Sequence, residues 1–323
     1  MGYGRWDDNA YEAARAYRRR AGVADFGYDA AMRTTPRDSW RADPRMDPYR
    51  VTARESRDSA DHPNSTPIVV LFDVTGSMGT VPVIVQQRLS RLHGLLTERG
   101  WCTDPQLLFG GIGDADTDQV PLQIGQFESD NRMDEQLRLI FLEGGGGGQK
   151  SESYELAGYF IAQHTVTDAW QKRGKKGYLF IIGDELNKER LRARHVRRVI
   201  GDRIDTDLRN DSIYAELAKR WETFFILPRQ TSYYEDREVN GHWRDLLGER
   251  FLKLEDPAAV SDLIALTIGM TEGRVDLGQG LADLGDVGTG AEQQAVARAL
   301  LAAGPAPLAA GSAPLAIGPS GRR

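Results

Sequence analysis

The stretch PIVVLFDVTGSMG, residues 67–79, decides the fold of this chain. Its apolar run, residues 68–72, is rich in strand formers and leaves neither face polar, which predicts a fully buried central strand. Polar residues begin where that strand ends, with Asp73, Thr75 and Ser77 at alternate positions. In an extended loop this spacing lets one carboxylate and two hydroxyls converge on one point. Ligation by oxygen atoms alone suits a hard cation such as Mg²⁺.

The segments around this stretch predict an α/β protein. Apolar runs alternate with amphipathic segments from residue 67 to about residue 266, a pattern typical of a sheet covered by helices. The turn DADTDQV joins the second and third expected strands so closely that this pair should be antiparallel. We therefore expect a doubly wound, mostly parallel six-stranded sheet, with helices on both faces and an antiparallel edge strand. The strands are expected at residues 68–72, 107–113, 121–127, 177–185, 223–228 and 250–257.

Hydrophobic spacing also places the helices and the ends of the domain. Residues 1–66 carry many charges and prolines with no long hydrophobic period, so they should form an arm that is disordered or laid across the domain, with one short helix. The α/β domain should span residues 67–270. A helical extension, residues 271–303, and a flexible, removable tail, residues 304–323, should follow. Helices are expected at residues 9–20, 83–99, 134–142, 152–164, 212–221, 258–269 and 291–303.

Composition excludes several classes of protein. A net charge of −6 and a pI near 5.5 argue against nucleic acid as the main partner. The lone Cys102 rules out an internal disulfide framework and fits a reducing compartment. The amino terminus has no apolar core of signal-peptide length, and no stretch reaches the roughly 20 apolar residues of a membrane span. These features predict a cytoplasmic protein without a membrane span.

The order of strand, DVTGSMG and helix resembles the von Willebrand factor A (VWA) domain, whose metal-ion-dependent adhesion site has the motif Asp-x-Ser-x-Ser. Here Thr75 replaces the first serine and keeps the hydroxyl. The resemblance covers about residues 67–269 and implies that Asp73, Thr75 and Ser77 hold Mg²⁺ or Mn²⁺. It adds Asp184, at the end of the strand at residues 177–185, as a further ligand. The alternative for the motif is a polar turn before a helix that begins near Pro82, and for Asp184 a helix cap.

One more ligand is expected from the loop after the five glycines. In the family it is a threonine, which this loop lacks. Counting from the following helix favours Ser151, while Ser153 and the carboxylate of Glu152 are the alternatives. Asp114 and Asp116, after the second strand, should be either an outer layer around the site or surface turn residues.

The resemblance also implies a function, that of a non-enzymatic protein-binding module of the intracellular prokaryotic type. A site with few direct carboxylates leaves its cation electrophilic, so an Asp or Glu of a protein partner can complete the coordination. Intracellular VWA proteins often work beside AAA+ ATPases, which makes such an ATPase the implied partner. No nucleophile or general base with a positioned partner can be named near the site, which argues against catalysis.

Two other stretches leave alternatives open. GGGGGQKS, residues 144–151, departs from a phosphate-binding loop only at Gln149, so a P-loop-like NTPase that uses this loop and Asp184 is the competing hypothesis. The basic stretch at residues 187–203 predicts a solvated surface helix or a docking surface for an acidic partner.

Overall fold

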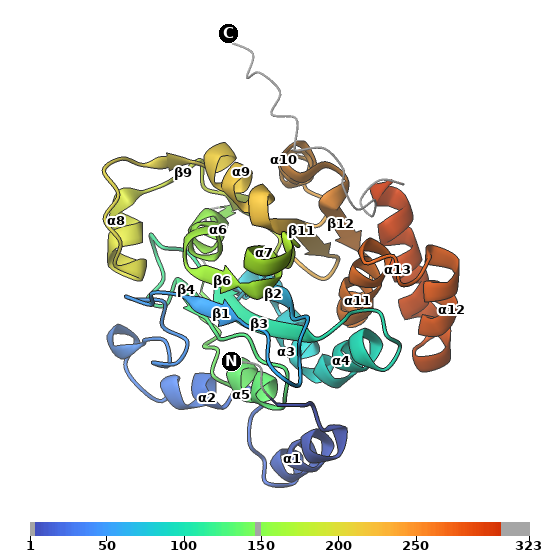
Figure 1. The fold of residues 1–323 in the computed structure, drawn as a ribbon. Coiled ribbons are helices and arrows are strands. Elements are labelled where there is room, and N and C mark those ends of the chain that lie inside the picture. Colours follow the sequence, from blue (N-terminus) through green and yellow to red (C-terminus); the bar gives the residue numbers. More distant parts are fainter. Residues whose placement is uncertain (1–3, 146–149, 305–323) are drawn as a thin grey trace.

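A six-stranded sheet forms the centre of the molecule in the computed structural model, which describes residues 4–145 and 150–304, with the side chains of residues 89 and 90 excepted. Its strand order is β12-β11-β7-β2-β3-β4 (Figure 1). All neighbours are parallel except β3 and β4, which are antiparallel. The expected mostly parallel sheet with one antiparallel pair is confirmed. The strands are β2 (Thr66–Asp73), β3 (Pro105–Ile112), β4 (Leu122–Ile124), β7 (Gly177–Ile182), β11 (Trp221–Pro228) and β12 (Phe251–Leu254).

Strand β2 lies at the centre because it can bury both of its faces. It pairs with β3 on one side and β7 on the other, with Val70 opposite Phe109 and Phe180, and all of its residues are buried. Side chains alternate between faces along a strand, so Val69 and Leu71 join one apolar cluster and Ile68, Val70 and Phe72 join the other. Each fully buried side chain of this kind contributes about 1.5–3 kcal/mol.

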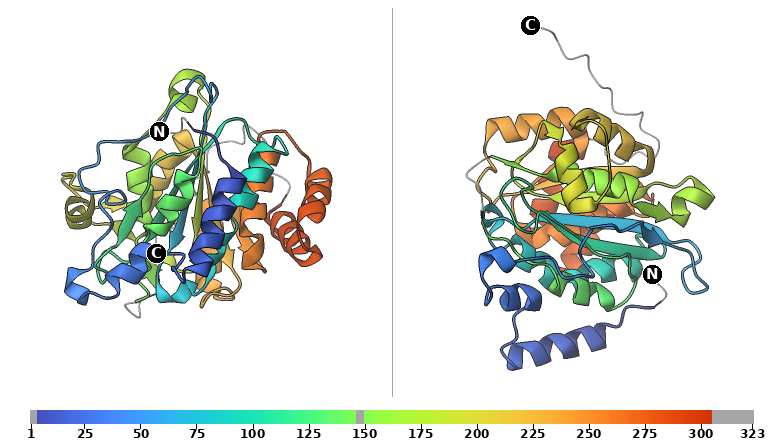
Figure 2. Two further views of the ribbon diagram at one scale, coloured as in Figure 1. Left: turned by 90° about the horizontal axis from the view of Figure 1, so that it is seen from below. Right: turned by 90° about the vertical axis from the view of Figure 1, so that its left-hand side faces the viewer.

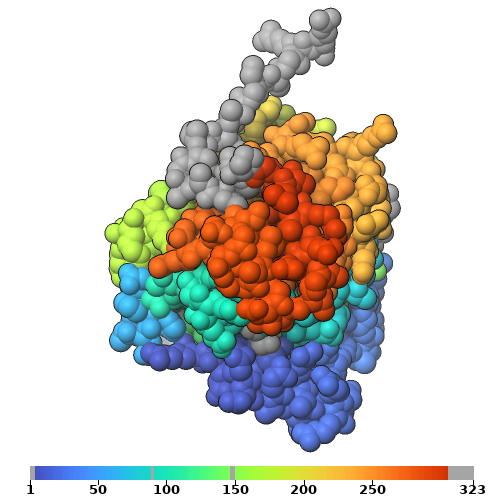
Figure 3. All heavy atoms as spheres, turned by 90° about the vertical axis from the view of Figure 1, so that its right-hand side faces the viewer, coloured from blue at the N-terminus to red at the C-terminus, as the bar shows by residue number. Residues whose placement is uncertain are grey.

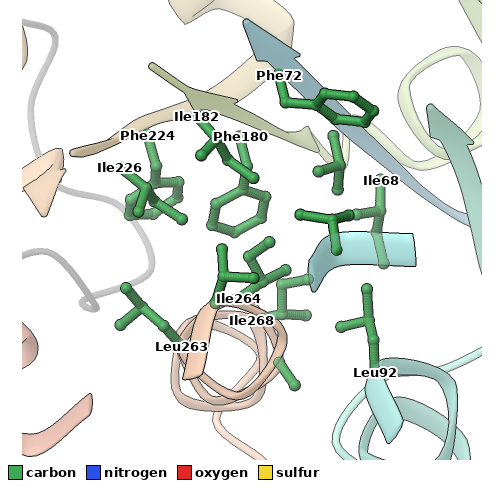
Figure 4. Packing of buried hydrophobic residues seen from close by; sticks show 14 of the residues in the cluster. Ile68, Phe72, Leu92, Phe180, Ile182, Phe224, Ile226, Leu263, Ile264 and Ile268 are labelled. Carbon is green, nitrogen blue, oxygen red and sulfur yellow. The ribbon is translucent and has the colours of Figure 1, made fainter. Parts of the chain in front are cut away.

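Helices cover both faces of the sheet. Figure 4 shows Ile264 and Ile268 of one helix in the same cluster as Phe72 and Phe180. This first layer consists of α3 (Val81–Gln87), α4 (Leu89–Thr97), α5 (Arg132–Arg138) and α11 (Val260–Thr271). The opposite layer consists of α6 (Tyr154–Gln163), α9 (Asn210–Arg220) and α10 (Arg237–Leu247).

Shorter elements complete the chain. They are α2 (Gly27–Met32), η1 (Arg37–Ser39), β1 (Arg54–Ser56), η2 (Gly76–Met78), β5 (Ser151–Glu152), β6 (Thr165–Thr167), α7 (Asp168–Arg173), β8 (Leu186–Asn187), β9 (Arg190–Leu191), α8 (Ala193–His195), the π-helix η3 (Val196–Ile200), β10 (Leu208–Arg209), η4 (Gly248–Arg250) and η5 (Pro257–Ala259). None of the helices in the described ranges is long and apolar enough to cross a bilayer.

The helix expected at residues 83–99 is two helices, α3 and α4, separated at Arg88. The backbone there, with φ −98° and ψ 4°, leaves the helical region. Arg88 and Arg91 both pair with Glu292 of the C-terminal helix. The break therefore coincides with a long-range ionic contact that local spacing could not reveal.

The carboxyl-terminal segment packs onto the same core as the sheet. Helices α12 (Leu277–Val287) and α13 (Gly290–Ala303) contribute Leu284, Val296 and Leu300 to the cluster that contains α4 and α11, and Figure 3 shows this orange-to-red region beside the cyan one. A Cβ at Gly280 would lie 2.2 Å from Leu266, so glycine allows the close approach of α12 to α11. The helix expected at residues 291–303 is α13. The predicted tail, from residue 305 onward, lies outside the described residues.

The amino-terminal arm lies across the domain. Its helix α1 (Asp8–Arg20) lies outside the first helical layer (Figure 2). Arg18 forms a buried ion pair of 2.9 Å with Asp134 of α5, and Tyr11 donates a hydrogen bond of 3.3 Å to the backbone carbonyl of Gln86. Of the two expectations for the arm, the packed one is correct for its described residues.

The docking of α1 should weaken in acid. Trp6 lies against His93 of α4, with ring centroids 5.2 Å apart, and burial lowers the pKa of His93 to about 4, with Asp8 opposing and His62 reinforcing the shift. A detached imidazole has a pKa near 6.5. Between pH 6.5 and 4 the detached state binds more protons, so stability falls as pH falls. We expect a loss of about 1–2 kcal/mol, below the roughly 3.5 kcal/mol that a shift of this size would give in a fully buried group at 1.4 kcal/mol per pKa unit.

Proteolysis of residues 1–66 at pH 7 and at pH 4.5 measures this loss. The variant His93→Phe should keep the ring contact and lose most of the pH dependence. An equal pH dependence in both proteins would contradict the assignment to His93.

Candidate metal centre

Two adjacent strands bring two aspartates to the carboxyl edge of the sheet. Asp73 is the last residue of β2, and Asp184 lies two residues beyond the end of β7. Phe72 and Ile182 are partners in the parallel pairing of these strands, so the chain continues from both strands at the same edge. Ligands of open α/β sheets bind at this edge. No helix follows Asp184 directly, because β8 begins at Leu186, and the alternative reading as a helix cap is excluded.

A chain of hydrogen bonds joins the two carboxylates. Asp73 Oδ1 accepts from the backbone N–H of Thr75, at 2.8 Å, and from its hydroxyl, at 2.6 Å. The Thr75 hydroxyl lies 3.1 Å from Ser77 Oγ, and the Ser77 hydroxyl donates to Asp184 Oδ1 at 2.8 Å. Thr80 precedes α3 without a capping hydrogen bond from its side chain. The hydroxyls of the motif therefore serve the two carboxylates rather than a helix end.

Residues that carry no sequence motif hold the two carboxylates and the backbone next to Asp184 in place. The Tyr154 hydroxyl donates to Asp73 Oδ2 at 2.8 Å, and the backbone N–H of Ser232 donates to Asp184 Oδ2 at 2.9 Å. Trp243 of α10 donates from Nε1 to the carbonyl oxygen of Glu185 at 2.8 Å. No spacing rule connects these positions to residues 73–77, so sequence reasoning missed all three.

Burial and mutual repulsion raise the pKa of the carboxyl groups at this edge of the sheet. Burial, followed by the charge of Asp184, raises the pKa of Asp73 to about 7. Burial raises the pKa of Glu152 to about 11, with Asp73 and Glu185 adding to the shift. The pKa of Glu185 rises to about 8 for the same reasons, burial first and then the charges of Asp73 and Asp184. The two glutamates were not among the favoured ligands.

No cation of the chain neutralises these groups within the described residues. Asp73, Glu152, Asp184 and Glu185 form no ion pair with Lys or Arg there, and Glu152 and Glu185 each leave Oε2 buried without a hydrogen-bond partner. Buried carboxylates without a countercharge are unfavourable. Nothing in the described part of the chain gathers three or more His, Cys, Asp or Glu side chains around one metal position. The oxygens here that could hold a cation are those of the two aspartates and the hydroxyls of Thr75 and Ser77.

The loop ligand is less well placed than the other four residues. Ser151 lies in β5, opposite Leu186, and no hydrogen bond among the described residues joins its hydroxyl to the other four. Ser153 is fully buried, and its hydroxyl accepts from the backbone N–H of Ala115 at 2.9 Å. Burial, and then the charge of Asp73, raises the pKa of the third candidate, Glu152. Within the described residues, neither serine hydroxyl has a hydrogen bond to the other four residues.

The glycine segment lies directly against the DVTGSMG loop. The backbone N–H of Gly76 donates to the carbonyl of Gly145 at 2.9 Å, and that of Gly144 donates to Val74 at 3.1 Å. A Cβ at Gly76 would lie 3.1 Å from the Gly144 carbonyl oxygen, so a side chain at residue 76 would crowd this contact. Residues 146–149, the middle of the proposed phosphate loop, lie outside the described residues.

Asp114 and Asp116 belong to an ionic network with the basic stretch. Asp114 is buried and pairs with Lys188 at 2.8 Å. Asp116 pairs with Arg192, at 3.0 Å, and with Arg194, at 2.9 Å. Asp114 is therefore not a surface turn residue. The basic stretch, residues 187–203, is helical only from residue 193 onward. Two short strands, β8 and β9, precede this helical segment, because they pair with the distant strands β5 and β10.

No protein-family model and no curated protein sequence matches this chain. Solved structures with a similar arrangement include the pilus adhesin SpaC from Lactobacillus rhamnosus GG in its open conformation, with 10% identity and a TM-score of 0.43 over 67% of this chain and 31% of the adhesin. Another is proximal thread matrix protein 1 from the mussel byssus, with 12% identity and a TM-score of 0.40 over 67% of this chain and 49% of that protein. The matched region spans less than half of each of these proteins.

Proposed function

We propose that this chain is a Mg²⁺-dependent protein-binding module whose partner presents an Asp or Glu side chain at the carboxyl edge of the sheet. One observation carries the proposal: buried carboxylates at this edge lack a countercharge from any described residue, while hydroxyls link two of them into one oxygen-rich set. Oxygen donors of this kind suit Mg²⁺ or Mn²⁺. A bound cation would supply positive charge and an open position for an oxygen of the partner.

The residues of the site would contribute to cation binding in different ways. Asp73 and Asp184 supply the charge, and Thr75 and Ser77 supply neutral oxygens. Tyr154 holds Asp73 through its hydroxyl, and the Ser232 backbone N–H holds Asp184. Because both aspartates are fixed by these donors, little side-chain freedom is lost when a cation binds.

The type of partner rests on the resemblance to VWA domains. Intracellular members of that family often work with AAA+ ATPases, so we propose an AAA+ ATPase, or a complex that it remodels, as the class of partner. We propose no catalytic role, since the two aspartates that accept from the Thr75 and Ser77 hydroxyls are assigned to the cation, and no histidine takes part in these hydrogen bonds.

Capture of partners from a native cell extract tests the proposal. The immobilised chain should retain a set of proteins in Mg²⁺ and release it in EDTA. Asp73→Asn should retain none of this set. The control Asp168→Asn, which changes a buried aspartate at the start of α7, should behave as the wild type. If the same proteins were captured in EDTA and by Asp73→Asn, a metal-bridged contact would be ruled out.

The NTPase alternative finds little support in the described residues around the glycine segment. A phosphate-binding loop joins a strand to a helix, whereas residues 139–145 contain no strand and Ser151 begins the short strand β5. Turnover of ATP or GTP by the purified chain, lost in Lys150→Ala, would restore this alternative. Stabilisation by Mg²⁺ without nucleotide would favour the protein-binding module.

A further inference from the structure

A second, basic site lies apart from the acidic edge. A cavity of about 610 Å³ opens between the amino-terminal arm at residues 41–49, the loop at residues 119–122 and the helical segment at residues 194–199. Four arginines line it, Arg41, Arg194, Arg197 and Arg198, with Asp47 as the only carboxylate among its lining residues. We call this cavity the arginine pocket. Its positive charge is local, because the chain as a whole has a net charge of −6.

Three of these arginines, Arg41, Arg197 and Arg198, have no ionic partner among the described residues. Arg41 and Arg197 are exposed and form no ion pair with any residue that the structure describes. Arg194 pairs with Asp116 at 2.9 Å, and Arg198 donates to the carbonyl oxygen of Ala115. The Asp47 carboxylate accepts the backbone N–H of Tyr49 at 2.9 Å. Clustered guanidinium groups repel one another, and an anion between them would relieve that repulsion.

Part of the wall of the arginine pocket is apolar. Pro48, Val120, Pro121, Leu122 and Val199 line it together with the half-exposed ring of Tyr49. A pocket of roughly 300–1,000 Å³ with apolar walls and a few charged groups is the usual form of a small-molecule site. A compact ligand with one anionic end and a ring or short apolar body matches this lining better than a long polyanion does.

Backbone contacts fix the two sides of the arginine pocket relative to each other. The Arg50 N–H donates to the Ile200 carbonyl at 2.7 Å, and the Ile124 N–H donates to the Met46 carbonyl at 2.7 Å. The Arg54 guanidinium bonds to the carbonyl oxygens of both Arg45, at 3.0 Å, and Ile124, at 2.8 Å. Figure 1 shows α8 on the side of the molecule where the blue arm passes. The arm is thus a built wall of the pocket, so a ligand need not order it.

We propose that the arginine pocket binds a small organic phosphate, with the phosphate between Arg41 and Arg197 and the organic body against the apolar wall. The planar guanidinium presents paired N–H donors that match two phosphate oxygens. This proposal does not rest on the metal proposed at the acidic edge. It also accounts for the basic stretch at residues 187–203, which the protein-binding function does not use.

Titration calorimetry with three probes tests the proposal. Adenosine monophosphate should bind, adenosine should bind at least about tenfold more weakly, and inorganic phosphate should bind more weakly than the monophosphate at equal ionic strength. The double variant Arg41→Gln/Arg197→Gln should weaken adenosine monophosphate binding at least about tenfold. The charge-matched control Arg20→Gln/Arg209→Gln changes two exposed arginines elsewhere and should leave it unchanged.

Three results would overturn the proposal. The first is equal affinity for adenosine and its monophosphate, and the second is an equal effect of the two double variants. The third is the absence of binding by adenosine monophosphate at millimolar concentration in the wild type. A melting curve of each variant accompanies the titrations, so that a loss of affinity is not confused with a loss of fold.

Discussion

Asp73→Asn should reduce Mg²⁺ affinity at least about 100-fold, above the 10–100-fold cost of losing groups that only support a ligand. The amide has nearly the shape of the carboxylate but no charge, and it keeps an oxygen to accept the two bonds from Thr75. Its nitrogen can donate to the Tyr154 hydroxyl. The fold should therefore survive, and without metal the variant should be no less stable than the wild type, because a buried charge near Asp184 is removed.

Calorimetry and melting curves with and without MgCl₂ measure this effect. A ligand at 100 times its Kd stabilises by about 2.7 kcal/mol, so the wild type should melt at a higher temperature in Mg²⁺ and Asp73→Asn should not. Asp168→Asn, another buried aspartate, should keep the response of the wild type. Unchanged Mg²⁺ affinity in Asp73→Asn would show that the site assignment is wrong.

Trp243→Ala should have the largest effect on stability. Trp243 is fully buried, stacks on Phe225 with ring centroids 3.6 Å apart, and meets Tyr154 edge-on at 5.6 Å. Truncation of such a ring costs about 3–5 kcal/mol, and the Glu185 carbonyl loses its donor at about 1–3 kcal/mol. Urea denaturation measures the sum.

The milder variant Trp243→Phe distinguishes the effect of Trp243 on packing from its effect on the metal site. It keeps most of the ring contacts and removes only the N–H donor, so it should fold. Because Tyr154 packs on Trp243 and holds Asp73, this variant should also bind Mg²⁺ more weakly. Trp101→Phe removes an equally buried indole from the opposite cluster and should lower stability without changing Mg²⁺ affinity. If the two variants bound Mg²⁺ with equal affinity, the expected influence of Trp243 on the metal site would be contradicted.

The sequence by itself determined the sheet and four of the candidate ligands. The runs at residues 68–72 and 177–182 are apolar on both faces, and only a central strand can bury both. Asp73, Thr75 and Ser77 are close in sequence, so their convergence follows from local geometry. Asp184 could be placed beside them because the carboxyl ends of parallel strands meet at one edge of a sheet.

Only the tertiary structure decided which groups surround these ligands. Tyr154, Ser232 and Trp243 reach the site from separate elements, and contacts between distant segments leave no periodic signal in the sequence. The same reason hid the break at Arg88, where the contact with Glu292 lies 204 residues away. The arginine pocket likewise needed the fold, because Arg41 and Arg197 belong to segments that meet only when the arm packs across the domain.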